Sequence, residues 1–494
     1  MTVVNPKSIS GINSITTGSG SDDLLTIHTN NGTERLRVDS TGATKIVTGI
    51  VTTLTATTGI VTSLEATTGD ITTLRAPTGI VTSLIANTAR ATTGIVTTLT
   101  ATTGIVTTFV TNTAKVGAAV TITESGIEAS GIGITCANIN GGQIGGRRNI
   151  LMNGGMVIDQ RTRGTVTTPT HETLVLDRWE SHLSQTGKFS VQQVEDAPSG
   201  EGVGKYSSKI TSLSAYTVTA NDYFVYNQNI EGSNVDHLQF GTSSAKTITV
   251  SFYVKSSLTG TFAMAISNQA YNRRQVQEYT INSANTWERK SLTFAGDTSG
   301  TWLTTNGVGM RVHWSLGGGS TYYSASPGTW LATNDFHTSN AVNVVSTNAA
   351  TFYLTGCQLE VGTQATPFEY RSVGEELQLC QRYYYVIADA RDGSGLKQMF
   401  NIHAYSNGQF ETTINYPVMR TNPSLVQVTG TGFYEAMNSS GTITFNNYNL
   451  YQACPRVCLL FQNSNLSASP NGGQGYRAQF NGSDGAYIHL VAEM

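Results

Sequence analysis

The chain has 494 residues, too many for one ordinary hydrophobic core, so about two to four domains are expected. Charged residues are only 12%, about half the usual share, while apolar residues reach 38%. This balance excludes a disordered chain and favours β-structure with uncharged polar surfaces. The net charge of −3 does not indicate a basic surface for nucleic acid. No apolar stretch is long enough to insert into a membrane.

Residues 1–45 are expected to form an N-terminal attachment segment that carries a β-hairpin. Apolar and polar residues alternate over 25–27 and 36–38, and Asn31-Gly32 between them is a typical hairpin turn. No basic stretch followed by an apolar one precedes the hairpin, so a secretory signal is not expected.

Residues 46–146 contain a ten-residue repeat typified by GIVTTLTATT and are expected to form a Thr/Gly-rich shaft. The repeat glycines fall at positions 49, 59, 69, 79, 94 and 104, so the one irregular gap keeps a five-residue sub-period. Gly and Thr are poor helix formers, and the apolar residues lie at even offsets, which predicts strands. One rung is too short to enclose a core. We therefore expect three chains around a common axis, with a single-chain solenoid as the alternative.

After a flexible GGQIGG joint at 141–146, the composition changes, and all five Trp lie within 179–330. Segments of alternating polarity follow at intervals of roughly ten residues, which predicts an antiparallel jelly-roll sandwich over residues 147–372. The segments are KTITVSFYVKSS, GTFAMAIS, RRQVQEYTI, TWERKSLTF, GVGMRVHWSL and ATFYLTGCQLEV.

Two motifs of this domain are expected to be structural. In LDRW, 176–179, the apolar ends should pack on the sandwich, while the charged middle pair should face a turn or form pairs. In the TPFEYR motif that follows QLEVG, Phe368 and Tyr370 should cover the core.

Residues 373–494 are expected to hold a short helix and a β-structured receptor-binding tip. The helix, VGEELQLCQRYY at 373–384, would have an apolar stripe and acidic residues in its first turn. The stripe would comprise Val373, Leu377, Cys380 and Tyr384. The predicted fold class is therefore all-β: a trimeric β-structured shaft, a jelly-roll β-sandwich, a short helix and a C-terminal β-sandwich tip.

The five cysteines are odd in number and sparse, so a disulfide framework is not expected. Cys454 and Cys458 form the one close pair, on what would be one face of a strand. No second Cys/His pair lies nearby, which favours buried, reduced thiols over a metal site. No cofactor or metal is expected.

Three passages together resemble the distal half of bacteriophage tail fibre proteins, notably those of phages that infect marine cyanobacteria. They are NILMNGGMVIDQRTRG with the LDRW that follows, GCQLEVGTQATPFEYRS, and ELQLCQRYYY. The resemblance covers roughly 147–494. It implies a jelly roll similar to carbohydrate-binding modules, a trimeric tip, host adhesion and a place in the virion after assembly in the host cytoplasm. The implied partners are two further copies of the chain, other tail or baseplate proteins at the N-terminus, and a host glycan or outer-membrane receptor.

Sugar binding uses aromatic faces against pyranose rings, with amides and carboxylates for the hydroxyls. The sandwich candidates are Trp302, Trp314, Tyr322, Tyr323 and Trp330. The candidates in tip loops are Tyr434, Asn446, Asn447, Tyr448, Asn465, Asn471, Tyr476 and Asp484. With a proximal shaft the chain's end would be distal, so the tip is expected to carry more of the binding than the sandwich.

No motif for nucleophilic, metal-dependent or nucleotide chemistry stands in a suitable context. A tailspike that cleaves polysaccharide would need two positioned carboxylates, and the spacing of the acidic residues fixes no such pair. The acidic residues considered are Asp159, Asp177 and Glu180, and Glu360 with Glu369. A non-catalytic adhesin is therefore expected, with a depolymerase tailspike or a head or baseplate decoration fibre as alternatives.

Overall fold

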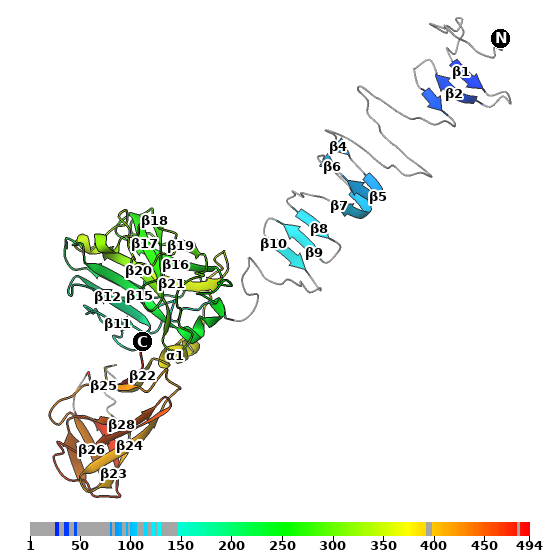
Figure 1. Cartoon of the computed structure of the whole chain (residues 1–494). Helices are drawn as coiled ribbons and strands as arrows, with labels where there is room; N and C mark the ends of the chain where they lie inside the picture. The colour runs from blue at the N-terminus through cyan, green and yellow to red at the C-terminus, as the bar shows by residue number, and fades with distance from the viewer. Residues whose placement is uncertain are drawn as a thin grey trace. The chain divides into compact units, whose positions relative to one another are not determined.

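The computed structural model describes residues 147–391, 398–481 and 485–494, and the strands alone within residues 1–146 (Figure 1). It confirms the all-β class: among the described residues one α-helix accompanies the strands β1 to β31. The chain divides into two compact units, Met1–Ile132 and Gly133–Met494. No helix in the described part of the chain is long and apolar enough to cross a membrane.

The predicted N-terminal hairpin is confirmed. β1 (Leu25–His28) pairs antiparallel with β2 (Glu34–Val38), with Leu25 opposite Val38. β3 (Thr44–Ile46) adds a third strand beside β2. The Asn31-Gly32 turn itself lies outside the described residues.

Within the repeat, described strands pair in parallel with the next copy of the same motif. Ile80 lies opposite Ile95, and Leu84 lies opposite Leu99, so copies of GIVTxL align across the fifteen-residue gap. The strands are β4 (Ile80–Val81), β5 (Leu84–Arg90), β6 (Ile95–Val96) and β7 (Leu99–Ile105). Pairing within one chain is the arrangement of the solenoid alternative, while the three-chain shaft stays a prediction. A separate meander follows with β8 (Thr113–Val116), β9 (Val120–Thr123) and β10 (Gly126–Ala129).

Residues 173–361 form a jelly-roll sandwich of two antiparallel sheets (Figure 1). The six-stranded sheet runs β11 (Thr173–Leu176), β12 (Trp179–Leu183), β15 (Tyr223–Glu231), β20 (Val308–Gly318), β17 (Gly260–Ser267) and β18 (Arg274–Ile281). The five-stranded sheet runs β13 (Phe189–Val194), β14 (Ser207–Ser212), β21 (Thr351–Val361), β16 (Ile248–Ser256) and β19 (Glu288–Phe294). All six segments predicted from alternating polarity coincide with strands β16 to β21.

The inward faces of the two sheets meet in one aromatic core. Trp314 of β20 lies with its ring centroid 5.5 Å from Phe252 of the opposite sheet and 5.4 Å from Trp179. All three side chains are fully buried, so the prediction for Trp179 in the LDRW motif is confirmed. Asp177 and Arg178 occupy the turn between β11 and β12, as expected, but they too are buried.

Two local predictions need correction. Tyr370 is 52% exposed and does not cover the core, whereas Phe368 is half-buried. The helix α1 spans Val373–Gln381, capped by the Ser372 hydroxyl, and Tyr384 already belongs to β22 (Tyr384–Asp389). Val373 is 54% exposed, and the helix buries Glu376 beside Cys380 instead. Burial of Glu376 follows from its contacts with an arginine and a backbone N–H, which periodicity cannot reveal.

The tip holds two antiparallel sheets around a second core. The small sheet runs β22, β31 (Tyr487–Val491) and β25 (Ser424–Gln427). The large sheet runs β27 (Gly441–Phe445), β26 (Tyr434–Asn438), β30 (Gly475–Phe480), β23 (Gln398–Ser406), β24 (Gln409–Asn415), β29 (Val457–Gln462) and β28 (Asn449–Cys454). Cys454 and Cys458 are unpaired thiols on the two strands of one hairpin, so they do not share a strand as the spacing suggested.

A fragment of residues 147–494 is expected to fold without the shaft, because it contains both cores. We expect a cooperative thermal melt with a near-ultraviolet signal from the five Trp, matching the full-length chain in that signal. A molten, aggregating fragment would contradict this boundary or show that the shaft is needed for folding.

Candidate functional site

The five aromatic candidates of the sandwich have different environments. Trp314 is fully buried in the core and cannot meet a ligand, so this prediction is corrected. Trp302 lines a pocket, and Trp330 lies against it with ring centroids 5.5 Å apart. Tyr322 is half-buried against Phe336 over the six-stranded sheet, and Tyr323 contacts His337. Burial thus leaves four of the five candidates as possible contacts.

Three of the tip candidates are core residues, which corrects their prediction. Tyr434, Tyr448 and Tyr476 are all buried, because their rings pack in the hydrophobic core of the tip. Tyr434 moreover donates its hydroxyl to the backbone carbonyl of Val428.

The amide candidates of the tip divide into two kinds. Asn446 is half-buried and holds a turn, since its Oδ1 accepts from the backbone N–H of Gly432 at 2.8 Å. Asn447 is also half-buried and bonds to the carbonyl of Tyr448. Asn465 and Asn471 are exposed. Asp484 lies outside the described residues.

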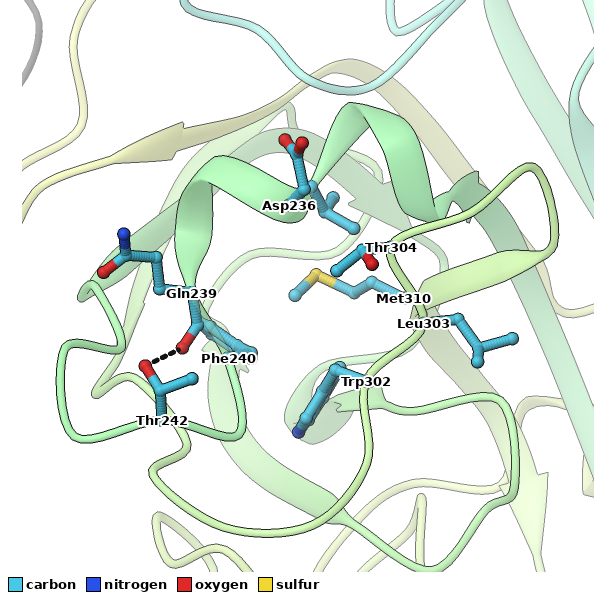
Figure 2. Close-up of a pocket in the computed structure, with 9 residues that line it drawn as sticks. Asp236, Gln239, Phe240, Thr242, Trp302, Leu303, Thr304 and Met310 are labelled. Carbon is cyan, nitrogen blue, oxygen red and sulfur yellow. Dashed lines mark hydrogen bonds between the residues drawn. The ribbon is translucent and has the colours of Figure 1, made fainter.

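The pocket at Trp302 is a cavity of about 340 Å³ (Figure 2). Trp302, Phe240 and Met310 form its apolar wall, and all three are largely buried. The exposed polar residues at its rim are Asp236, Gln239, Thr242 and Thr304. An aromatic wall with exposed polar residues at its rim can hold a small ring and orient its polar groups.

The indole of Trp302 is fixed in place from both sides. Its Nε1 donates to Asp297 Oδ2 at 3.2 Å, and Asp297 in turn pairs with Arg273 at 2.6 Å. The Phe240 ring meets the indole edge to face, with centroids 4.9 Å apart. This pre-organisation lowers the entropy that a ligand must lose on binding.

Sequence reasoning found Trp302 but missed Phe240, Asp236 and Gln239. They follow β15: Asp236 begins a short 3-10 helix, Gln239 caps that helix with a left-handed backbone (φ 56°), and Phe240 comes next. No local pattern signals this, because the pocket joins segments about sixty residues apart.

The carboxylates considered for catalysis serve structural roles. Asp159 accepts from the backbone N–H groups of Thr162 and Gly164 and so closes a turn. Glu360 binds Thr366, and Glu369 accepts from backbone N–H groups near the start of the sandwich.

One group of described residues could hold a metal ion. His171, Glu172 and His182 offer ligand atoms within 4.8 Å of one another. Each imidazole uses one nitrogen, since His171 Nδ1 accepts from Leu183 at 3.4 Å and His182 Nε2 lies 2.9 Å from Glu180. The remaining imidazole nitrogens and the carboxylate suit a zinc-type ion better than Ca²⁺.

Asp177 is expected to make the protein more stable as the pH falls from about 6 to about 4. Burial raises the pKa of Asp177 to about 6, against the attraction of Arg161 and hydrogen bonds from Gln160. In this window the folded state takes up the proton and the unfolded state, with a pKa near 3.8, does not, so acidification stabilises the fold. Asp177→Asn should therefore stabilise the protein more at pH 7 than at pH 4, measured by thermal melts.

Asp222→Asn is the matched control with the opposite sign. Burial alone would raise the pKa of Asp222, but hydrogen bonds from Thr219, Tyr216 and Ser184 lower it to about 2. The ionised Asp222 carboxylate stabilises the fold at pH values above its unfolded pKa of 3.8. This stabilisation is lost as the pH falls toward about 2. An effect of Asp177→Asn that is the same at every pH would contradict the assignment.

No family model matches the sequence, and no curated protein matches it. Three similar solved structures illustrate what is found. The enzymatically active domain of tailspike protein 4 from bacteriophage CBA120 aligns with 43% of this chain at 12% identity and a TM-score of 0.25. The alignment spans 21% of that protein's chain, so only about a fifth of its length is matched.

The other two are carbohydrate-binding modules. TmCBM61, solved with β-1,4-galactotriose, aligns over 44% of this chain and 99% of its own, at 12% identity and a TM-score of 0.23. A family 11 module from Clostridium thermocellum, solved with a β-1,3-1,4-mixed-linked tetrasaccharide, aligns over 41% and 98%, at 15% identity and a TM-score of 0.21. At such TM-scores the likeness establishes neither fold nor function, and the fold class stands on the strand pairing described above.

Proposed function

We propose that the chain is a non-catalytic adhesin that binds a surface polysaccharide through the jelly-roll sandwich. The pocket at Trp302 is the observation that carries this proposal. Its volume of about 340 Å³ is at the small end for ligand sites and suits one sugar ring. The indole and the Phe240 ring offer apolar surface, and the exposed rim offers hydrogen-bonding groups of several kinds.

The proposal extends to a bacteriophage tail fibre that acts as a homotrimer in the virion, assembled in the host cytoplasm. The sequence resemblance and the Thr/Gly repeat support this part. A single small pocket binds a sugar weakly, and three copies on one axis would raise the effective concentration enough for useful avidity. The N-terminal segment would attach to tail or baseplate proteins. A head or baseplate decoration fibre has the same binding chemistry and is the alternative location.

The absence of catalysis is also part of the proposal. It is supported by the structural hydrogen bonds of Asp159, Glu360 and Glu369, which occupy the carboxylates that a depolymerase would have to keep free for substrate.

Removal of the pocket rim is expected to reduce adhesion without changing the fold. The double variant Asp236→Ala/Thr304→Ala alters two exposed side chains and should lower binding at least about tenfold, because each lost sugar hydrogen bond costs about 1 kcal/mol and avidity multiplies the loss. The measurement is binding of the fluorescent full-length protein to marine cyanobacterial cells, with surface polysaccharide intact or stripped.

The control variant Glu195→Ala/Thr286→Ala changes two exposed residues of the same sandwich that do not line the pocket. Equal binding to stripped cells would overturn the polysaccharide as receptor. Unchanged binding of the rim variant, combined with loss on replacing the tip loops 446–448 and 463–476, would move the site to the tip.

A further inference from the structure

Two arginines stand at the same level on the outer face of the six-stranded sheet. Arg274 of β18 and Arg311 of β20 both lie directly opposite Ser267 of β17, the strand between them. Side chains alternate across a strand, and the neighbours Met310 and Val312 lie in the core, so Arg311 points to the outer face. The small Ser267 side chain between them bonds to His313 Nε2 at 2.8 Å and not to either guanidinium group.

Tyr271 brings the two guanidinium groups together. Its ring centroid lies 4.2 Å from the guanidinium carbon of Arg311 and 5.1 Å from that of Arg274. Tyr271 lies in the loop of residues 268–273. Asn268 holds this loop, because its Oδ1 accepts from the backbone N–H groups of Asn272 and Arg273 at 3.2 Å. Tyr271 has φ 55°, a strained conformation for a large side chain that the surrounding bonds must maintain. Strain of this kind is typical of residues positioned for a function.

The positive charges of this face lack partners in the described part of the chain. Arg311 donates to amide and carbonyl oxygens, at 3.1 Å to Asn229 Oδ1 and at 2.7 Å to the Gln269 carbonyl. Arg274 is 2% exposed, and its buried Nε has no acceptor among the described residues. Burial lowers the pKa of Arg274 to about 9. The positive charge of Arg311 also lowers this pKa, whereas Tyr271 raises it.

The nearby carboxylates act on the two arginines without forming an ion pair: Asp335 opposes the lowering of the pKa of Arg274, and Glu180 opposes that of Arg311. Glu180 accepts from His182, Asn227 and Asn229, and Asp335 accepts from Thr333. A cation–ring contact contributes about 0.5–2 kcal/mol, less than the several kcal/mol that burial of a charge costs. Among the described residues no carboxylate forms an ion pair with either arginine, so an external anion can serve as their partner.

The adjoining row of the same face is polar, and its side chains are buried: Glu180 and His313 are 3% exposed and Asn227 is fully buried. His313 lies opposite Asn227, and Asn227 lies opposite Glu180, so an imidazole, an amide and a carboxylate stand side by side. Asn227 Oδ1 is buried without a hydrogen-bond donor among the described residues. His182 and Tyr223 at the edge of this row are half-buried and meet solvent.

We propose that this face binds the carboxylate of an acidic sugar unit, held by Arg311 and Arg274, with the sugar ring against Tyr271. Guanidinium groups recognise carboxylates with two parallel hydrogen bonds, and the half-buried Arg311 and Tyr271 provide the side of approach. That the ligand is an anion follows from the two arginines, which form no ion pair among the described residues. That the anion belongs to a sugar rests on the proposed function, and the site is separate from the pocket at Trp302.

The test is a calorimetric titration of the full-length protein with each of three probes: sodium glucuronate, glucose and sodium sulfate. Glucuronate is expected to bind at least about tenfold more tightly than either other probe, since charge-assisted hydrogen bonds add to the ring contact. Arg274→Met and Arg311→Met should each weaken glucuronate at least about tenfold. Without ligand, Arg274→Met should melt no lower than the wild type, because it removes an unpaired buried charge. Arg289→Met, an exposed arginine on β19, is the control.

Arg274→Lys is the second variant, in case Arg274→Met fails to fold. It keeps the positive charge but loses the planar guanidinium group, so it should bind glucuronate several-fold more weakly than the wild type. Equal binding of glucuronate by the wild type and Arg274→Met would overturn the proposal. Binding of sulfate as tight as that of glucuronate would overturn the inference that the anion belongs to a sugar. Glucose bound as tightly as glucuronate, with loss only in the Asp236→Ala/Thr304→Ala variant, would overturn this site and leave the proposed function standing.

Discussion

Replacement of Trp314 by alanine is expected to destabilise the sandwich by about 3–5 kcal/mol, the usual cost of truncating a buried Trp. Trp314 is fully buried and lies with Trp179 on its own sheet and Phe252 on the opposite one, so its loss leaves a cavity between the two layers. All five Trp lie within 179–330, so Trp fluorescence, which Tyr and Phe do not dominate, reports the sandwich. Its thermal midpoint should fall by about 10 °C.

The comparison variant is Tyr370→Ala, an aromatic that is 52% exposed. Truncation there should change the midpoint little, because an exposed ring has few contacts to lose. A Trp314→Ala protein with an unchanged melt but lost glycan binding would contradict the core assignment and restore this residue as a ligand contact.

Glu493→Gln is expected to cost about 3–5 kcal/mol, because it removes one partner of a buried ion pair. The Glu493 carboxylate pairs with Arg178 and Arg161, and Arg178 is 3% exposed beneath the ring of Tyr383. Burial alone would lower the pKa of Arg178, but Glu493 and its neighbours raise it overall, which marks a charge that depends on its partner. These contacts join the sandwich to the end of the tip.

The measurement is again the thermal melt of the full-length chain, with Glu195→Gln as control. Glu195 and Lys205 form an ion pair in which both side chains are more than half exposed, and such solvent-screened pairs contribute little to stability. A melt of Glu493→Gln as high as that of the control would mean that the junction does not depend on this carboxylate.

The amino-acid sequence determined the elements whose pattern is local. Alternation of apolar and polar residues located β16 to β21, because a strand between a core and solvent imposes a period of two. The apolar stripe and the first-turn acids located the start of α1, and the ten-residue repeat predicted strands where β5 and β7 are found. The polar run of β15 gave no such signal, since Asn227 and Gln228 are buried by other strands.

The candidate site depended on the tertiary structure. Trp302 and Trp314 are equivalent in a pattern of aromatic residues, yet one lines a pocket and the other fills the core. The difference arises because Phe240 reaches Trp302 from a segment about sixty residues away. Likewise, Arg274 and Arg311 lie opposite the same residue, Ser267, because of the register of three neighbouring strands. Alternation specifies which residues share a face, but only the register between strands decides which of them meet.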